Sequence, residues 1–184
     1  ANLKKYFNQN VRDFDGTKMR VAHILFKCSL DTPAEQQVLL RERAGQLSRR
    51  IREGEVSFAA AARRYSDAPT ASQGGAIGVI QRNEPMPDAF ARVAFMLQAG
   101  EVSGPVRTRF GIHLIQCLEV TPGSRKWSEV RSQVRESVAR YLFSWAADQQ
   151  SRTAQVVWTG VISRPMSAVE VDGTSERPEA IDSK

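Results

Sequence analysis

The chain has 184 residues, of which 41% are hydrophobic and 25% charged, a composition ordinary for a globular protein with one core and some appendages. No apolar run approaches the ~18 residues that a membrane span needs, so the sequence predicts no integral membrane segment. Lysine and arginine outnumber aspartate and glutamate by 26 to 20, but the charges are interspersed and no recognition motif accompanies them, which argues against nucleic-acid binding.

The N-terminal segment, residues 1–18, is predicted to be a helical remnant followed by a linker. Leu3, Tyr6 and Phe7 form a short apolar stripe at helical spacing, for which the sequence offers no evident partner. No basic region followed by an apolar stretch is present, so we expect no signal peptide in this segment.

A strand and a long helix are expected next. The β-branched and aromatic residues of 20–28 favour a strand. The motif "TPAE" predicts a helix start with Thr32 as the N-cap and Pro33 at the first helical position. Apolar residues at helical spacing continue the helix, and Gly54 is expected to end it.

The following elements suggest an α+β fold. In chain order they are a short helix capped by Ser57 and running through Tyr65, a loop over 66–75, a strand over 76–81, a helix from Asp88 ended by Gly100, a turn with a brief strand, and a strand over 110–120. With the first strand and helix, the predicted order is β-α-α-β-α-β-β.

Residues 122–162 are predicted to form an amphipathic helix and a short strand, and residues 163–184 a disordered tail. The helix over 127–145 has an apolar face that needs a partner. That face could complete a lobe with sequence missing upstream, pair within the chain, or form a homodimer, and the sequence leaves these alternatives open.

The chain has only two histidines, His23 and His113, and each lies within a predicted strand. With Cys28 and Cys117 they form a superficially zinc-like set. However, His113 and Cys117 would lie roughly 13 Å apart along a strand, whereas zinc holds its ligands within about 2.3 Å. His23 and Cys28 would face opposite sides of the sheet. We therefore predict no metal and no cofactor; the plain alternative is that both histidines are satisfied core residues.

Several separated motifs carry a family resemblance. They are "HIL" at 23–25, "YSDAPTASQGGAIG" at 65–78, "PMPDAFARVAF" at 85–95 and "GEVSGPVRTRFGIHLI" at 100–115. Taken in this order, they resemble the parvulin-type peptidyl-prolyl cis/trans isomerases over residues 19–121. The flanking helical segments have a looser likeness to extracytoplasmic foldases of the SurA and PrsA kind.

The resemblance implies a four-stranded antiparallel sheet wrapped by helices, with an additional C-terminal helix. It places the two histidine strands side by side at the centre, so that His23 and His113 can meet across the sheet and hydrogen-bond. The same arrangement sends Cys28 and Cys117 toward opposite ends, and no disulfide between them is expected.

The resemblance also implies roles for individual residues. Catalytic roles are implied for His23 and His113. The substrate proline ring is expected to be held by Met86, Phe90, Phe110 and Ile77, although apolar residues of these elements often serve only the core. The family usually has cysteine or aspartate where this chain has Ala68, so Asp67, one residue earlier, is the candidate carboxylate; a role as a turn residue is the equal alternative.

The implied function is isomerisation of Xaa-Pro bonds in proline-containing, unfolded or folding polypeptides. The loop "CSLDTPAE" lacks the basic cluster of phosphate-directed members, so phospho-specificity is not expected. Two alternatives are a peptide-binding chaperone module with little isomerase activity and a structural appendage of a larger exported protein. The resemblance favours an extracytoplasmic location, with a cytoplasmic one still open.

Overall fold

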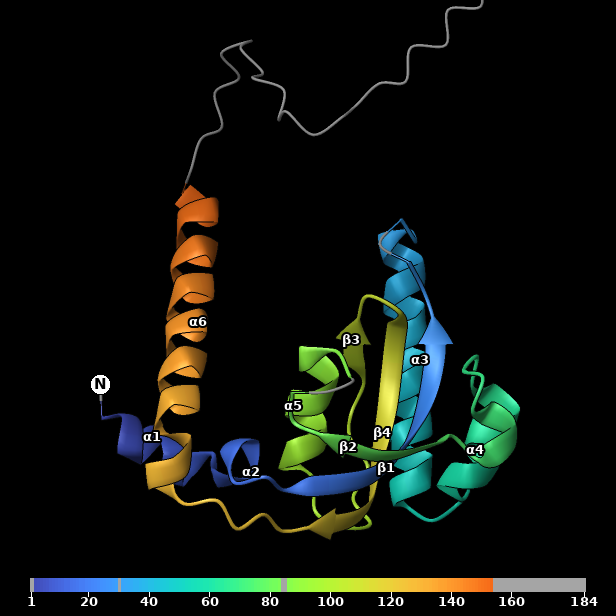
Figure 1. Ribbon diagram of the computed structural model, residues 1–184. Coiled ribbons are helices and arrows are strands. Elements are labelled where there is room, and N and C mark those ends of the chain that lie inside the picture. The colour runs from blue at the N-terminus through green and yellow to red at the C-terminus, as the bar shows by residue number, and fades with distance from the viewer. Residues whose placement is uncertain (1, 30, 84–85, 154–184) are drawn as a thin grey trace, which may run out of the picture. The chain divides into compact units, whose positions relative to one another are not determined.

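The computed structural model describes residues 2–29, 31–83 and 86–153 (Figure 1). The strand expected near residue 156 and the predicted tail over 163–184 lie outside the described residues. The chain divides into two units, Ala1–Ser144 and Trp145–Lys184, and all the contacts discussed below belong to the first. No described helix is long and apolar enough to span a membrane.

One antiparallel sheet of four strands forms the centre of the first unit (Figure 1). Its strands lie in the order β2-β1-β4-β3 and are β1 (Lys18–Lys27), β2 (Ala76–Gln81), β3 (Val106–Thr108) and β4 (Gly111–Thr121). The two long strands that carry the histidines are therefore neighbours at the centre. This confirms the expected α+β fold, including an additional C-terminal helix, α6 (Trp127–Thr153).

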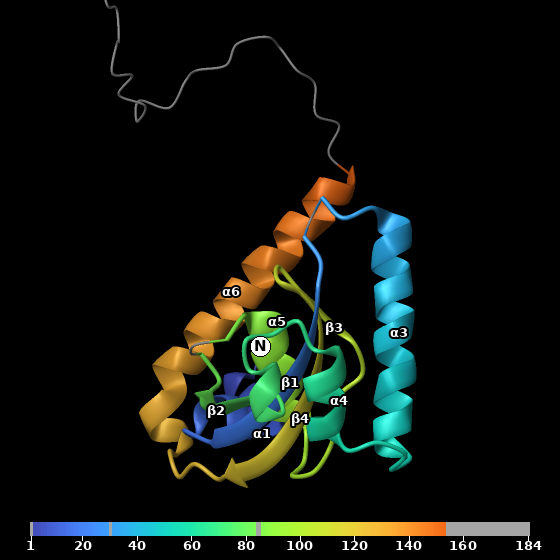
Figure 2. The same cartoon turned by 90° about the vertical axis from the view of Figure 1, so that its right-hand side faces the viewer.

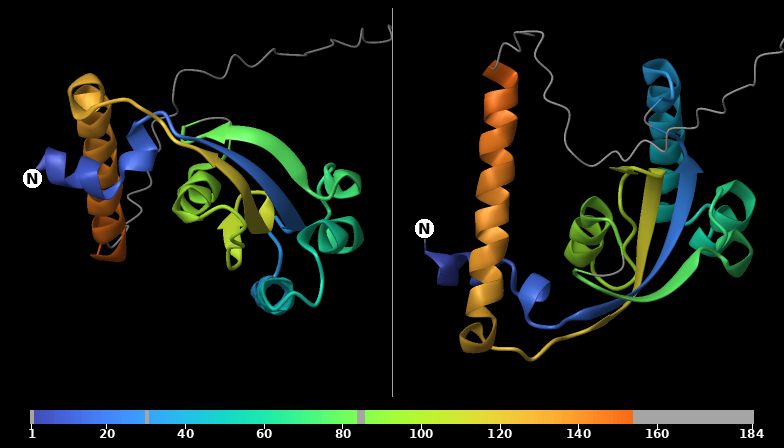
Figure 3. Two further views of the ribbon diagram at one scale, coloured as in Figure 1. Left: turned by 90° about the horizontal axis from the view of Figure 1, so that it is seen from below. Right: turned by 45° about the horizontal axis from the view of Figure 1, so that its top comes forward.

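Helices cover both faces of the sheet because alternate side chains of β1 and β4 are apolar on both sides. Helices α3 (Ala34–Arg52) and α4 (Phe58–Tyr65) pack on one face, which includes Ile24 and Leu114, and they lie beside each other in Figure 2. Helix α5 (Asp88–Met96) packs on the other face against residues that include Val21 and Ile115 (Figure 3). The candidate site lies on the α5 face.

Two of the predicted helix boundaries are wrong. Helix α3 begins at Ala34 with Pro33 as its cap, because the Thr32 hydroxyl accepts a hydrogen bond from the Ser29 N–H (2.9 Å) and caps no helical amide. Helix α5 ends at Met96, where the chain turns extended, and not at Gly100. By contrast, Ser57 caps α4 as expected, since its hydroxyl accepts from the Ala60 N–H (3.2 Å).

The N-terminal segment has a partner within the chain. It forms helices α1 (Leu3–Gln9) and α2 (Val11–Phe14), which pack against the first half of α6. We call this packing the N/C cluster; its members are Phe7, Phe14, Val130 and Val134, with the partly buried Leu3, Tyr6, Trp127 and Val138. Of the three alternatives for the α6 face, pairing within the chain therefore applies to its first half. Tyr141, Leu142 and Phe143, further along, are exposed.

Candidate functional site

The two histidines meet on the α5 face of the sheet. The register pairs His23 with Ile115 and Leu25 with His113, so the two imidazoles are diagonal neighbours on β1 and β4. Their Nδ1 atoms lie 3.4 Å apart, and the ring centroids 5.5 Å apart. His113 is only 2% exposed, whereas His23 is half-buried. The predicted contact between the histidines is thus present in the structure.

Thr108 is a third member of this network, and sequence reasoning missed it. Its hydroxyl oxygen lies 2.8 Å from His113 Nε2 and accepts a hydrogen bond from the Phe110 N–H (3.1 Å). The short hairpin between β3 and β4 brings it there, because Val106 pairs with His113 and Thr108 with Gly111. The only available signal was that two strands joined by so short a turn must place their residues opposite one another.

Both imidazoles are neutral near pH 7. Burial lowers the pKa of His113 to about 4, and the neighbouring His23 adds to the effect. Burial also lowers the pKa of His23 below its ordinary value. In both cases the physical cause is that a buried imidazolium loses hydration. The contact between the histidines therefore joins one N–H donor and one lone pair, without a positive charge.

The Thr108 hydroxyl determines the direction of this chain of hydrogen bonds. Its oxygen accepts from the Phe110 amide, and its own proton needs an acceptor because the residue is buried. His113 Nε2 is that acceptor, so the remaining proton of His113 lies on Nδ1 and is donated to His23 Nδ1. In this arrangement His23 presents an Nε2–H group.

Phe90 connects α5 to the histidines. Its side chain is fully buried, and its ring stands edge-on to both imidazoles, with centroid distances of 6.0 Å to His23 and 5.5 Å to His113. Such edge-to-face contacts favour a defined ring orientation. Phe90 thus packs against both histidines, and its expected role in holding a proline ring stays a prediction.

Ile77 reaches the same face through a β-bulge. Val21 pairs with Gly78 and Ala22 with Ala76, so Ile77 is an extra residue in β2 without a partner in β1. A bulge of this kind re-aims a side chain, and Ile77 consequently packs with the apolar residues around Phe90.

Met86 joins this apolar group, but Phe110 does not. Met86 is partly buried and packs in the same cluster as Phe90. The Phe110 ring is 49% exposed, with the Arg109 guanidinium 4.7 Å from its centroid. The Phe110 amide also donates to the Thr108 hydroxyl, so its backbone lies in the turn between β3 and β4. The role expected for Phe110 in holding a proline ring stays a prediction.

Asp67 is engaged with the backbone of β1. Its carboxylate accepts from the Lys27 N–H (2.9 Å), and its own N–H donates to the Leu25 carbonyl (2.7 Å). Neither histidine is a hydrogen-bond partner of Asp67 among the described residues. Ala68, at the position where the family usually has cysteine or aspartate, is buried and brings no polar group.

Two surface hollows lie away from these residues. One of about 230 Å³ is lined by residues that include Arg12, Arg82 and Arg125, and another of about 730 Å³ by residues that include Ile51 and Gln116. In the part of the chain that the structure describes, no three His, Cys, Asp or Glu side chains cluster so that they could hold a metal. Cys28 and Cys117 are buried free thiols.

Comparisons with known proteins place the chain in a family. Residues 23–119, more than half of the chain, match the rotamase family described as a PPIC-type PPIASE domain. The chain is 32% identical over 136 residues to the chaperone SurA of Xanthomonas oryzae pv. oryzae, and 36% identical over 144 residues to that of Cupriavidus metallidurans. These alignments cover 74% and 75% of this chain, but only 29% and 28% of the relatives' own length.

A solved structure shows the same fold. The crystal structure of a PpiC-type peptidyl-prolyl cis-trans isomerase domain superposes with a TM-score of 0.53 and 26% sequence identity. The superposition covers 61% of this chain and 98% of that domain. The sheet and its surrounding helices are thus a complete domain of this type, while the N/C cluster includes residues on both sides of the segment that the family matches.

Proposed function

Because the chain belongs to the rotamase family of PPIC-type peptidyl-prolyl isomerase domains, we propose that it accelerates cis/trans rotation about Xaa-Pro bonds in unfolded or folding polypeptides, without phospho-specificity. The observation that carries this proposal is the neutral network of Thr108, His113 and His23, with Phe90 edge-on to both imidazoles. Ile77 and Met86 add apolar surface beside it for a proline ring.

Catalysis of this rotation requires no bond to be broken. The barrier of ~18–20 kcal/mol arises from amide resonance, so a site lowers it by binding the twisted amide more tightly than the planar one. An apolar surface favours the twisted form because the planar amide has the larger dipole and loses more on leaving water. Lowering the barrier by about 5 kcal/mol would accelerate rotation several thousandfold.

In this mechanism the two histidines form an ordered, uncharged surface beneath the substrate proline ring. A neutral pair keeps the surface beneath the proline ring free of a formal charge, and the hydrogen bonds hold both imidazoles in fixed orientations. The Nε2–H of His23 is the donor that remains for a substrate oxygen. No proton transfer is needed in the rotation, so His23 and His113 act here by orientation.

The test is NMR exchange spectroscopy on short Xaa-Pro peptides with substoichiometric protein, with the residue before proline varied. We expect exchange to accelerate and Met86→Ala to reduce the acceleration several-fold. Met96→Ala is the matched control, because the same substitution is made at an exposed methionine at the end of α5. Exchange no faster than in the protein-free sample would contradict the proposal.

A second candidate is a peptide-binding chaperone module with little isomerase activity. Two observations favour it: buried Ala68 offers no polar group, and one oxygen of the Asp67 carboxylate accepts a hydrogen bond from the Lys27 amide. This function predicts that the protein suppresses aggregation of a denatured client and binds Xaa-Pro peptides while leaving their exchange rate unchanged. Loss of acceleration in Asp67→Asn would instead place Asp67 in an active isomerase site.

The same relatives are the basis for proposals about the partners and the location of this protein. The curated relatives are named chaperones, and this chain spans less than a third of their length. We infer polypeptide clients and an extracytoplasmic location. The exposed Tyr141, Leu142 and Phe143 of α6 are available to a second copy or to an upstream segment; concentration-dependent sedimentation separates the first alternative from the second.

A further inference from the structure

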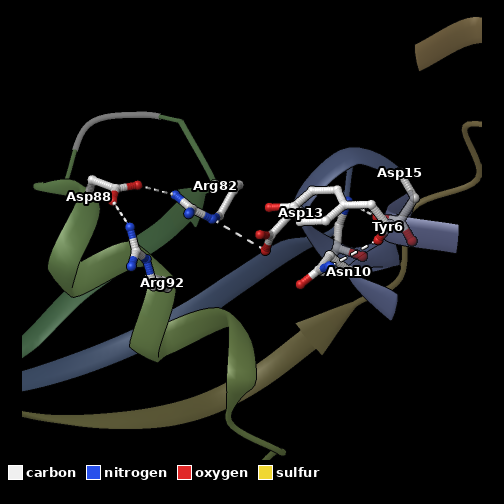
Figure 4. Close-up of polar contacts among 8 residues, drawn as sticks. Tyr6, Asn10, Asp13, Asp15, Arg82, Asp88 and Arg92 are labelled. Carbon is white, nitrogen blue, oxygen red and sulfur yellow. Dashed lines mark hydrogen bonds and ion pairs between the residues drawn. The ribbon is translucent and has the colours of Figure 1, made fainter. Parts of the chain in front are cut away.

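Two adjacent residues of α2 are connected to the two ends of α5, Arg12 by direct hydrogen bonds and Asp13 through Arg82. The Arg12 guanidinium donates to the Leu97 carbonyl and to the Gln98 side-chain oxygen, both at 3.0 Å, directly after the last residue of the helix. Asp13 Oδ1 lies 3.2 Å from Arg82 Nε, and Arg82 Nη1 lies 2.8 Å from Asp88 Oδ1 at the first residue of α5. Figure 4 shows the path from Asp13 through Arg82 to Asp88.

The position of α5 matters because this short helix carries Phe90. The Phe90 ring touches both imidazoles edge-on, so a shift of the helix would move the ring relative to His23 and His113. Contacts at both helix ends restrain sliding and tilting more than a contact at one end can. Helix α2, although outside the sheet and its helices, is thereby mechanically connected to the candidate site.

We propose that Arg12 and Asp13 are positioning residues for the isomerase site, which act by holding both ends of α5 and hence the Phe90 ring. The inference rests on the proposed function and extends it beyond residues 23–119, the segment that matches the family. Because α2 also contributes Phe14 to the N/C cluster, a change in the packing of that cluster can move Arg12 and Asp13 and so affect isomerisation.

The ion pair between Asp13 and Arg82 is largely buried, as expected of a contact that fixes the position of its partners. The side chains of Arg82 and Asp13 are only 15% and 22% exposed. Arg82 Nε is buried and makes no directed hydrogen bond, so its contact with Asp13 is an ion pair. Burial raises the pKa of Asp13 even though Arg82 opposes the effect. Burying this pair therefore costs free energy. When Asp13 is replaced by a neutral residue, Arg82 keeps Asp88 as its partner, so no unpaired charge is left and stability should change little.

Asp88 completes the connection on the other side of Arg82. Burial alone would raise the pKa of Asp88, but hydrogen bonds from Arg82 and Arg92 outweigh it and lower the pKa below the ordinary value. The carboxylate therefore remains charged at neutral pH. A negative charge in the first turn of α5 also interacts favourably with the helix dipole, which further stabilises the charged form of Asp88 that pairs with Arg82.

The experiment compares Asp13→Asn and Arg12→Gln with the control Arg50→Gln, which removes an exposed ion pair with Glu55 on the other face of the sheet. We measure kcat/KM on an Xaa-Pro peptide, thermal stability, and the NMR ring signals of the two histidines. We expect kcat/KM to fall about three- to tenfold in the first two variants, with the Tm close to that of the control. The histidine signals should shift because the Phe90 ring current moves, and Asp13→Glu should restore most of the activity.

The outcomes separate this inference from the proposed function. Wild-type kcat/KM and unmoved histidine signals in both variants would overturn the inference. A fall in kcat/KM without any movement of those signals would overturn it too, because the loss would not pass through Phe90. Shifted signals in a protein whose wild type does not accelerate exchange would support the positioning contact and reject isomerisation as the function.

Discussion

Thr108 supplies the hydroxyl on which the orientation of His113 depends. Thr108→Val removes that hydroxyl at nearly constant shape and leaves His113 Nε2 buried without its partner. An unsatisfied buried polar group costs about 1–3 kcal/mol, so we expect a loss of that size in the free energy of unfolding together with slower Xaa-Pro exchange. Urea denaturation and NMR exchange measure the two effects.

The control for this substitution is Thr121→Val, made at an exposed position at the end of β4. It should change the free energy of unfolding by only a few tenths of a kcal/mol. Equal stability losses in both variants would show that the Thr108 hydroxyl has no special part in holding His113.

The lowered pKa of His113 predicts that stability depends on pH. The folded state holds this imidazole neutral down to about pH 4, whereas the unfolded chain protonates it near pH 6.5, so the unfolded state binds more protons between these values. The contribution is complete above pH 6.5 and is lost as the pH falls. From His113 alone we expect a decrease of about 1 kcal/mol in the free energy of unfolding between pH 7 and 5.5.

Urea denaturation at the two pH values tests this expectation. In His113→Gln the side chain does not titrate, so the decrease should shrink by most of that amount even if the variant is less stable at both pH values. A variant with the same pH dependence as the wild type would assign the effect to other groups.

At this scale the resemblance supplied more of the site than residue patterns did. The contact between the histidines was expected from the matching motifs, because the family resemblance implied that their two strands are neighbours. The role expected for Phe90 in holding a proline ring stays a prediction, and its packing against the imidazoles was not expected. Thr108, Arg12 and Asp13 were not expected. Thr108 lies only five residues from His113, but their contact depends on the pairing of β3 with β4. Arg12 contacts Leu97 and Gln98, 85 and 86 residues away in sequence, and no local pattern indicates such neighbours.

Among the elements, the loop that enters β2 depends on Gly75. Its φ is +82°, and a Cβ there would overlap the His23 carbonyl oxygen, while the Gly75 carbonyl accepts from the His23 N–H at 2.8 Å. Gly75→Ala should therefore destabilise the fold by roughly 2–4 kcal/mol, since it combines an unfavourable φ with a backbone clash. Thermal or urea unfolding measures the loss.

Gly54 offers a matched comparison for this substitution. Its φ is +79°, but a Cβ there would meet nothing within 4 Å. Gly54→Ala should cost only the conformational part, about 1 kcal/mol. If the two alanine variants lose equal stability, the close approach of Gly75 to the His23 carbonyl makes no measurable contribution to the free energy of unfolding.

The order and type of the elements could be predicted because hydrophobic periodicity and glycine positions are local signals. The predictions that were wrong concern positions where another hydrogen bond, local or tertiary, replaces the one that the sequence pattern indicates. The Thr32 hydroxyl accepts from Ser29 instead of capping α3. The bulge at Ile77 could not be predicted from the sequence, because it is a property of the pairing between β1 and β2. The site face depends on that register, so its full composition required the structure.

At the scale of the whole molecule, the N/C cluster is a small core separate from those on the two sheet faces. Val134→Asp places a charge at a fully buried position of this cluster, which is strongly unfavourable without a partner. We expect hydrogen exchange to rise in α1, α2 and the first half of α6, while the central amides of β1 and β4 keep their protection.

Ser132→Asp introduces the same charge on an exposed position of the same helix and serves as the control. It should leave exchange in the N/C cluster unchanged. Simultaneous loss of protection in β1 and β4 of Val134→Asp would show that the cluster and the sheet unfold as one cooperative unit. The sequence indicated that both terminal segments needed partners, but apolar stripes do not specify which segment pairs with which.

Among the described residues the sheet ends in two edge strands, β2 and β3, and both are poor templates for another strand. Edge strand β3 has only three residues, and edge strand β2 is interrupted by the bulge at Ile77. Short or bulged edges resist the strand-to-strand addition by which proteins aggregate. A protein proposed to act on unfolded polypeptides is repeatedly exposed to extended, apolar segments that can add to a sheet edge. The same bulge that directs Ile77 toward the site would thus also help to keep the protein from being recruited into the aggregates of its own clients.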